Sequence, residues 1–226
     1  MRIVTWNVNG LKAAISNGGV DRVKALDADI YCFQETKLSD EEPDILPGYR
    51  MNYFSSKRKA YAGLLTASRD TPYSFSTRLP DFEDDTEARV LISDFGSFNQ
   101  ANVYFPTFQK NLDRKDYRLQ FDDALYSTLI SLNCDKPVIL CGDFNTYLSK
   151  IDIYPENERM HREDSGLLED SRDNLLDFMD QGFSDAYRRD CLLQIFDIRS
   201  LPSDMSRKMP IPRESTMSCG ELPLIR

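Results

Sequence analysis

Short apolar runs alternate along the chain with polar turns, a pattern typical of a mixed α/β domain. The runs with strand composition are Arg2–Trp6, Ile30–Phe33, Ala60–Ala67, Val90–Asp94, Gln100–Phe105 and Val138–Cys141. Gly96-Ser97 separates two of these runs and predicts a hairpin between them. Gly63 within the third run predicts the close approach of another backbone. Pro43–Tyr53 has the composition of a loop.

Helical spacing of apolar residues predicts four helical segments. Two short ones are expected over Leu11–Ile15 and around Val20 to Leu26. A longer helix is expected over Asp116–Leu132, and another from about Glu169 to Gln181. Gly182 follows the last of these as an ordinary helix C-cap.

The stretch PVILCGDFN at 137–145 holds the strongest candidate chemistry. A buried strand is expected to stop at Gly142, and Asp143 and Asn145 then leave its end on the same side. A carboxylate and an amide in this place suit catalysis on a phosphate ester. The alternative is a strand followed by an Asx turn without chemical function.

Other predicted strands also end in polar residues, at Asn7, Glu35 and Tyr104. Together with Asp143 and Asn145, they predict a sheet edge lined by two carboxylates, two amides and a phenol. This set fits a hard cation such as Mg²⁺ rather than zinc, which prefers histidine and cysteine. For Tyr104 the alternative is a packed ring.

Composition indicates a soluble globular protein of one large domain or two small ones. The 226 residues are 41% hydrophobic and 29% charged, with a net charge of −9. An acidic chain is not attracted as a whole to nucleic acid or anionic lipid, so a polyanionic partner must meet a local basic patch and metal ions.

Cysteine usage and hydropathy point to a cytoplasmic protein. The five cysteines are odd in number, match no zinc spacing and suit a reducing compartment. The N-terminal MRIVTWNVNG has no signal-peptide core, and no apolar run is long enough to span a membrane. We expect a monomer without membrane contact.

Several motifs resemble the exonuclease III and apurinic/apyrimidinic endonuclease family, within the endonuclease/exonuclease/phosphatase superfamily. They are WNVNGLKAAI at 6–15, DIYCFQETKL at 29–38, TEARV at 86–90, NVYFP at 102–106, KDYRLQFDDAL at 115–125 and GDFNTYLSKIDI at 142–153, with a weaker match at 166–188. They keep the family's order and approximate spacing over residues 1–189.

The resemblance implies a four-layer α/β sandwich of two packed, mostly antiparallel sheets. It implies hydrolysis of DNA phosphodiesters, either 5′ to an abasic site or stepwise from a 3′ end. The implied cofactor is Mg²⁺, with Mn²⁺ as a substitute, and the implied partner is double-stranded DNA with abasic sites or 3′ ends.

The resemblance also implies roles for individual residues. Asn7, Glu35, Asp143 and Asn145 would form the metal site, with Glu35 the direct ligand. Tyr104 would contact the scissile phosphate, Asp143 would act on the nucleophilic water or leaving oxygen, and Asn145 would steady the phosphate. Lys37, Arg89 and Arg118 would order the site or touch the DNA backbone; the alternative for these three is solvated surface charge.

The chain departs from the family pattern after residue 189. The family's Trp-rich segment and its terminal S-D-H motif, whose Asp–His pair is central to catalysis, have no counterpart: Trp6 and His161 are the only tryptophan and histidine. His161 lies in a polar stretch and is expected at the surface. We therefore expect an incomplete second sheet and a poorly ordered tail at 190–226, as a truncated or frame-shifted gene or a lineage without activity would give. Ala88 also replaces a glycine common in its motif.

Three hypotheses follow. The first is a magnesium-dependent DNA repair nuclease. The second keeps the enzyme class but changes the substrate to a non-DNA phosphoester. The third is an inactive or incomplete family member, because the Asp–His pair is missing and general acid–base groups contribute several powers of ten.

Overall fold

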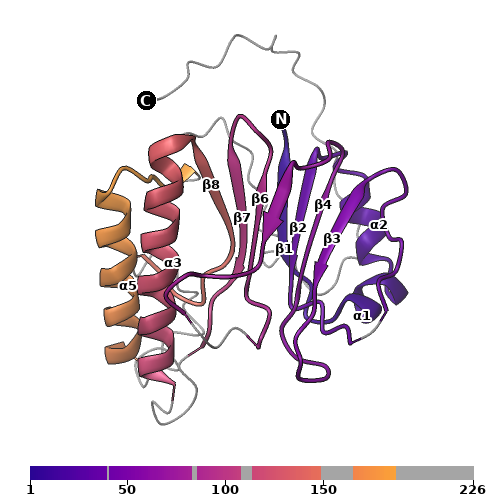
Figure 1. Ribbon diagram of the computed structural model, residues 1–226. Helices are drawn as coiled ribbons and strands as arrows, with labels where there is room; N and C mark the ends of the chain where they lie inside the picture. Colours follow the sequence, from indigo (N-terminus) through magenta and orange to yellow (C-terminus); the bar gives the residue numbers. More distant parts are fainter. Residues whose placement is uncertain (40, 83–85, 108–113, 149–164, 187–226) are drawn as a thin grey trace, which may run out of the picture.

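Two four-stranded sheets pack face to face, with helices on both outer sides (Figure 1). The computed structural model describes residues 1–39, 41–82, 86–107, 114–148 and 165–186. The first sheet has the order β1 (Ile3–Asn7), β2 (Ile30–Gln34), β4 (Leu64–Ser68), β3 (Arg50–Phe54). The second has the order β5 (Ser74–Ser76), β6 (Val90–Asp94), β7 (Asn99–Tyr104), β8 (Val138–Asp143).

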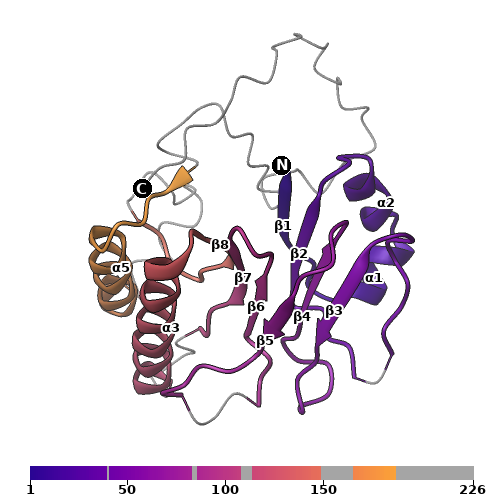
Figure 2. The same cartoon turned by 45° about the horizontal axis from the view of Figure 1, so that its top comes forward.

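Helices cover the outer face of each sheet (Figure 2). The short helices α1 (Leu11–Ser16) and α2 (Gly19–Lys24) lie on the first sheet. The long helices α3 (Lys115–Asp135) and α5 (Ser165–Asp180) lie on the second. The predicted four-layer α/β sandwich is therefore confirmed.

Strand pairing also agrees with the expected sheets. In each sheet one neighbouring pair is parallel, β1 with β2 and β7 with β8, and the other pairs are antiparallel. The predicted hairpin is present as β6 and β7, which turn through Gly96.

Four details of the sequence interpretation are wrong. Part of the expected loop 43–53 is the edge strand β3, and β5 was not expected at all. Gly63 precedes β4 instead of lying inside it, although its carbonyl does accept a hydrogen bond from the Thr36 backbone. Helix α5 begins at Ser165, four residues before the expected start near Glu169.

Strand β8 is half-buried along most of its length, not buried as expected. It is the edge strand of the second sheet within the described part of the chain, so one of its long sides has no neighbouring strand. Only its last residue, Asp143, is buried. The expectation of an incomplete second sheet stays a prediction.

Two apolar cores lie between the sheets and their helices. The first packs α1 and α2 against β1, β2 and β4, around Leu11, Phe33 and Leu65. The second packs α3 and α5 against β6 and β7, around Phe121 and Leu129. Burial of these side chains is the main source of stability.

The layer between the two sheets is polar by contrast. Asn102 of β7 is fully buried, and its Nδ2 donates to the carbonyl oxygens of Leu65 (3.0 Å) and Phe33 (3.3 Å) on the other sheet. Its Oδ1 accepts a 2.7 Å hydrogen bond from Nε2 of Gln34. These bonds hold the sheets in one relative position, because a slip would leave buried amides unpaired.

Within the described residues, no helix has the length and apolar character needed to cross a membrane. His161, most of the polar stretch around it and the segment 190–226 lie outside the described residues. The division of the chain at residue 189 stays a prediction.

Candidate active site

The ends of strands from both sheets meet at one end of the sandwich. Parallel pairing places Asn7 of β1 beside Gln34 of β2, directly before Glu35. The same pairing places Tyr104 of β7 beside Asp143 of β8. Because β1 packs across from β8, the two pairs of strand ends come together.

Asn7 joins the two carboxylates. Its Nδ2 lies 2.7 Å from Oε1 of Glu35 and 2.7 Å from Oδ2 of Asp143, so one amide bridges the first sheet to the second. Its Oδ1 accepts a 3.0 Å hydrogen bond from the backbone N–H of Asn9. Glu35 and Asp143 do lie close together as predicted, because both carboxylates bind the same amide.

Glu35 is surrounded by donors. Nζ of Lys37 lies 2.9 Å from its Oε2 and also contacts Asn9. Burial alone would raise the pKa of Glu35, but hydrogen bonds from Asn7, Lys37 and Tyr104 outweigh it and lower the pKa from its ordinary value of 4.5. Glu35 is therefore ionised at neutral pH.

Tyr104 keeps its proton. Burial, the charge of Glu35 and the hydrogen bond to Glu35 raise its pKa, and Arg89 only partly opposes them. A neutral phenol beside two carboxylates is a hydrogen-bond donor. Tyr104 is therefore more than the packed ring of the alternative interpretation, because its hydroxyl binds Glu35.

Asp143 and Asn145 form the Asx turn that was the alternative interpretation of this stretch. The backbone N–H of Asn145 donates to Oδ1 of Asp143 (3.2 Å), and its Nδ2 donates to the Phe105 carbonyl oxygen (2.8 Å). The turn does not exclude a chemical role, because the other oxygen of Asp143 faces Asn7.

Backbone strain gathers at this end of the sandwich. Glu35, Lys37 and Asn145 have positive φ angles of 53°, 52° and 47°. Side chains other than glycine adopt this region at a cost of order 1–3 kcal/mol each. Such strain is common where a fold aims side chains at a functional site.

Gly142 is required by close packing between β8 and β7. Its φ is 153°, and a Cβ atom there would lie 1.9 Å from the carbonyl oxygen of Val103. No other residue fits without moving the strand that carries Asp143.

The three predicted basic residues differ in position. Lys37 belongs to the cluster through Glu35. Arg89 and Arg118 are buried, at 2% and 0% exposed, so the alternative of solvated surface charge is wrong for both. Arg118 pairs with a different carboxylate, with Nε 2.7 Å from Oδ1 of Asp122 and Nη1 2.7 Å from the Pro106 carbonyl oxygen.

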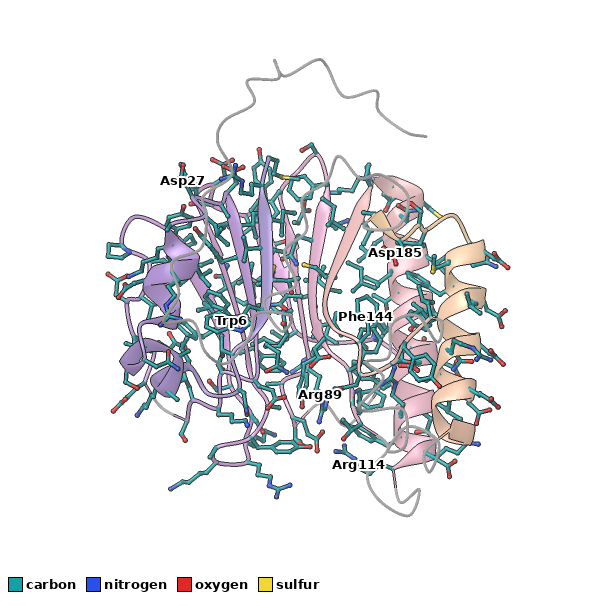
Figure 3. The ribbon with its side chains drawn as sticks, turned by 180° about the vertical axis from the view of Figure 1, so that it is seen from behind. Trp6, Asp27, Arg89, Arg114, Phe144 and Asp185 are labelled. Atoms are coloured by element: carbon teal, nitrogen blue, oxygen red, sulfur yellow. The ribbon has the colours of Figure 1, made fainter. Side chains whose placement is uncertain are left out.

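Arg89 contacts Tyr104 directly. Its guanidinium lies over the phenol ring, 4.8 Å from the centroid, and its Nη1 donates to the Tyr104 carbonyl oxygen at 3.0 Å. Figure 3 places Arg89 and Arg114 near the same end of the sandwich, opposite Asp27. Arg89 and Arg118, the two arginines named from the sequence, therefore bind backbone carbonyls at the end of β7 and just after it, from inside the fold.

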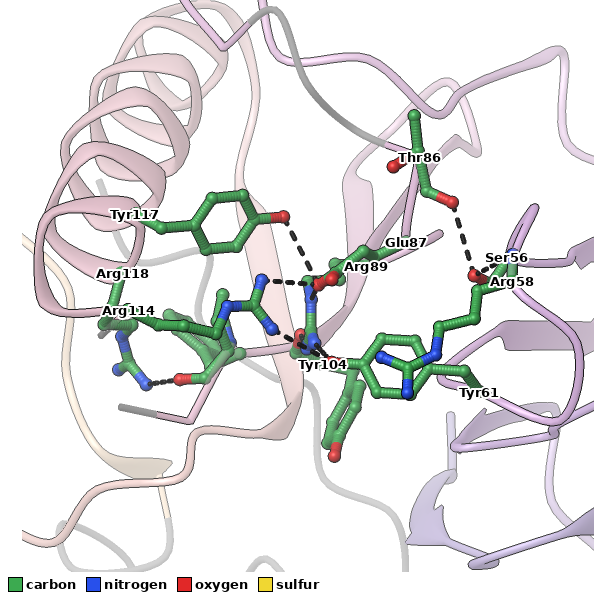
Figure 4. Close-up of polar contacts among 12 residues, drawn as sticks. Ser56, Arg58, Tyr61, Thr86, Glu87, Arg89, Tyr104, Arg114, Tyr117 and Arg118 are labelled. Atoms are coloured by element: carbon green, nitrogen blue, oxygen red, sulfur yellow. Dashed lines mark hydrogen bonds and ion pairs between the residues drawn. The ribbon is translucent and has the colours of Figure 1, made fainter. Parts of the chain in front are cut away.

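Sequence reasoning missed three residues beside Arg89: Tyr61, Glu87 and Arg114 (Figure 4). Glu87 lies in the TEARV motif and could have been noticed there. Tyr61 and Arg114 carried no signal, because only the fold brings the loop before β4 and the beginning of α3 to β6.

The donor set fits a hard cation held by few protein ligands. Among the residues that the structure describes, no three His, Cys, Asp or Glu side chains gather so as to hold a metal ion. The two carboxylates joined through the Asn7 amide match the preference of Mg²⁺ for one or two carboxylates and several waters.

Comparison with known proteins gives a consistent result. The family described as "Endonuclease/Exonuclease/phosphatase family" matches residues 4–194. The chain is 35% identical to an exodeoxyribonuclease of Bacillus subtilis, over 83% of this chain and 75% of the relative. It is 32% identical to the DNA repair nuclease APEX1 of Danio rerio, covering 62% of that protein, which is less than two thirds of its length.

Solved structures share the fold. An AP endonuclease from Archaeoglobus fulgidus superposes with a TM-score of 0.70 at 26% identity, over 83% of this chain and 74% of that one. The 3′ phosphatase NExo from Neisseria, bound to a product DNA hairpin, gives a TM-score of 0.63 at 27% identity, over 79% and 71%.

Proposed function

Since the chain belongs to the Endonuclease/Exonuclease/phosphatase family, and so to a class of phosphodiester hydrolases, we propose that it is a DNA repair nuclease. Its activities would be those of an apurinic/apyrimidinic endonuclease and a 3′–5′ exodeoxyribonuclease. The observation that carries the proposal is the Asn7 bridge, which brings carboxylates of two separate sheets within hydrogen-bond distance of one amide.

The proposed substrate is double-stranded DNA with abasic sites or 3′ ends. Support comes from the relatives: the Bacillus protein is named an exodeoxyribonuclease, and the Neisseria structure contains a product DNA hairpin. The net charge of −9 requires that the DNA meet local cationic groups. Lys37 is the candidate at the carboxylates, with its side chain 31% exposed.

The family generally depends on a divalent metal ion. In this chain, Glu35 and Asp143 would hold Mg²⁺ or Mn²⁺. Asn7 and Asn145 are the further proposed ligands, and the Asn7 amide would have to turn, because its Nδ2 faces both carboxylates and its Oδ1 accepts from the Asn9 N–H. The bound ion supplies charge stabilisation to the phosphate.

The remaining chemistry falls to the side chains. Asp143, buried at the end of β8, would orient the attacking water or take its proton. The neutral phenol of Tyr104 would donate a hydrogen bond to a phosphate oxygen, and Asn145 would steady the phosphate. Arg89 and Arg118 would act through Tyr104 and Pro106, because both are buried.

We expect activity near background from a protein of these 226 residues alone. The only histidine is His161, and the S-D-H motif is absent from the sequence. Loss of a general base costs roughly 10²–10⁴-fold in rate.

The test is a chimera in which the C-terminal segment of the Bacillus relative follows residue 189. With Mg²⁺ it should cleave an abasic-site duplex, and Asp143→Asn in the chimera should abolish cleavage. An inositol phosphate serves as the non-DNA substrate. Hydrolysis of that substrate without cleavage of DNA would overturn the proposal, as would a folded chimera that cleaves neither.

A further inference from the structure

Glu87 is the centre of a second polar cluster, which reaches Tyr104 through Arg89 (Figure 4). Its Oε2 lies 2.6 Å from Nε of Arg89 and 2.8 Å from Nη2 of Arg114. It also accepts a longer hydrogen bond of 3.4 Å from the hydroxyl of Tyr117. One carboxylate oxygen thus joins the segment before β6 to the beginning of α3.

Arg89 passes this contact on to Tyr104. Its Nε is bound to Glu87, its Nη1 to the Tyr104 carbonyl oxygen and its Nη2 to the Tyr61 hydroxyl, at 2.6, 3.0 and 2.9 Å. Its guanidinium face lies on the ring of Tyr104. Each of the three nitrogens of the Arg89 guanidinium therefore binds a neighbouring residue.

A buried guanidinium needs a countercharge, and Glu87 supplies it. Burial alone would raise the pKa of Glu87, but Arg114 and Arg89 outweigh it and lower the pKa below 4.5. Arg89 is buried and Glu87 is 19% exposed, so removing Glu87 would leave the buried Arg89 charge without this partner. Arg89 would then be expected to leave the ring of Tyr104 and seek water.

The backbone is bent to make this contact. Ala88 lies between the two charged residues with a φ of +56° and is fully buried. A residue other than glycine adopts this conformation at a cost of about 1–2 kcal/mol. The fold therefore accepts strain at the point where Glu87 meets Arg89.

We propose that Glu87 is a positioning residue: it holds Arg89 against the ring and carbonyl of Tyr104, and so aims the Tyr104 phenol at Glu35. It acts through Arg89 and touches no substrate. Its catalytic consequence rests on the proposed function, whereas its effect on the position of Tyr104 does not.

The first test is ¹⁹F NMR of the full chain labelled with 3-fluorotyrosine. The variant Tyr104→Phe assigns the Tyr104 resonance by its disappearance. In Glu87→Gln this resonance should shift and broaden. The matched control is Glu41→Gln, which removes an exposed carboxylate bound to Lys12 and should leave the resonance in place.

Glu87→Asp is the second variant, because it keeps the charge but shortens the side chain. It should shift the Tyr104 resonance less than Glu87→Gln does, and it decides the question if Glu87→Gln does not fold. An unmoved Tyr104 resonance in the folded variants would overturn the proposal.

The second test uses the chimera described above. Glu87→Gln should lower kcat roughly 10- to 100-fold, since small displacements at a catalytic group have effects of this size, and should leave KM within about twofold. Glu87→Asp should recover part of kcat. A rise in KM at unchanged kcat would show a direct DNA contact and overturn the positioning role. A chimera without activity would contradict the proposed function, while the NMR result still decides the position of Tyr104.

Discussion

The two faces of each sheet are built from different chemistry. The outer faces pack against helices through apolar side chains, such as Phe33 and Leu65 on one sheet and Phe121 and Leu129 above the other. The inner faces meet through buried amides, above all Gln34 and Asn102. Apolar packing is not directional, whereas a hydrogen bond has a fixed partner and geometry.

Because of this difference, the stability of each sheet and the position of one sheet on the other depend on different side chains. The outer cores make each sheet and its helices stable, but they do not determine how the sheets lie on each other. The inner amides do, because each bonds to an atom of the opposite sheet. The candidate site depends on that placement, since Asn7 must reach Glu35 on its own sheet and Asp143 on the other.

The largest effect is expected in an outer core. Leu129→Ala removes a fully buried side chain of α3 and should lower the free energy of unfolding by about 4 kcal/mol. The affinity for the proposed Mg²⁺, measured by calorimetry on the folded variant, should stay within about twofold of that of the unchanged chain. A loss of Mg²⁺ binding in a variant that still folds would contradict the separation.

The next effect concerns the inner layer. Asn102→Ala removes the hydrogen bonds that link Asn102 to Gln34 and to the Leu65 carbonyl on the other sheet, and it should lower the free energy of unfolding by about 2 kcal/mol. Because the sheets lose their register, Mg²⁺ affinity should fall about tenfold as well. A variant that loses stability but keeps its affinity would show that the amides only stabilise the fold.

A smaller effect, of opposite sign, is expected at Ala88. Its positive φ is strained for alanine and permitted for glycine, so Ala88→Gly should raise the free energy of unfolding by about 1 kcal/mol. The control is Ala101→Gly in β7, a regular strand position where glycine should destabilise by a similar amount. Urea denaturation of both variants measures the difference. If Ala88→Gly lowers the free energy of unfolding, the backbone at Ala88 is not strained.

The smallest effect is a pH dependence carried by Glu87. Because its pKa is lower in the folded chain than the ordinary 4.5, its contribution to stability is present above about pH 4.5 and is lost as the pH falls through the lowered value. Glu87→Gln should flatten this part of the curve of unfolding free energy against pH.

Salt distinguishes this buried contact from an exposed one. The Glu87 contribution should persist in 1 M NaCl, whereas that of the exposed Glu41–Lys12 pair should be screened. If both contributions vanish in salt, Glu87 is solvated in solution.

Strand and helix positions were largely readable along the chain. The ends of β1, β2, β7 and β8 coincide with the polar residues at which apolar runs stop, so Asn7, Glu35, Tyr104 and Asp143 could be named in advance. Strand β3 could not be predicted, because its residues lie in a stretch with the composition of a loop and form a strand only by pairing with β4. The short strand β5 is exposed and carries no alternating pattern.

The basic residues teach the opposite lesson. The sequence of a motif does not reveal whether its arginine faces solvent, DNA or the protein interior. Arg118 lies fully buried against Asp122, four residues further along α3, and Arg89 is buried under contacts from the loop before β4, the 87–89 segment and β7. Burial depends on which elements cover a side chain, and those elements are distant in the sequence.

The sequence by itself determined where strands and helices form, where the strands end and which polar residues stand at those ends. These features depend on residues that are close together along the chain. The packing of one sheet on the other specified the rest. It brought Asn7 to Asp143 across 136 positions of sequence, and it joined Glu87 to Arg114 and Arg89 to Tyr61. Distances between remote side chains follow from the three-dimensional arrangement of layers, which near-neighbour preferences do not encode.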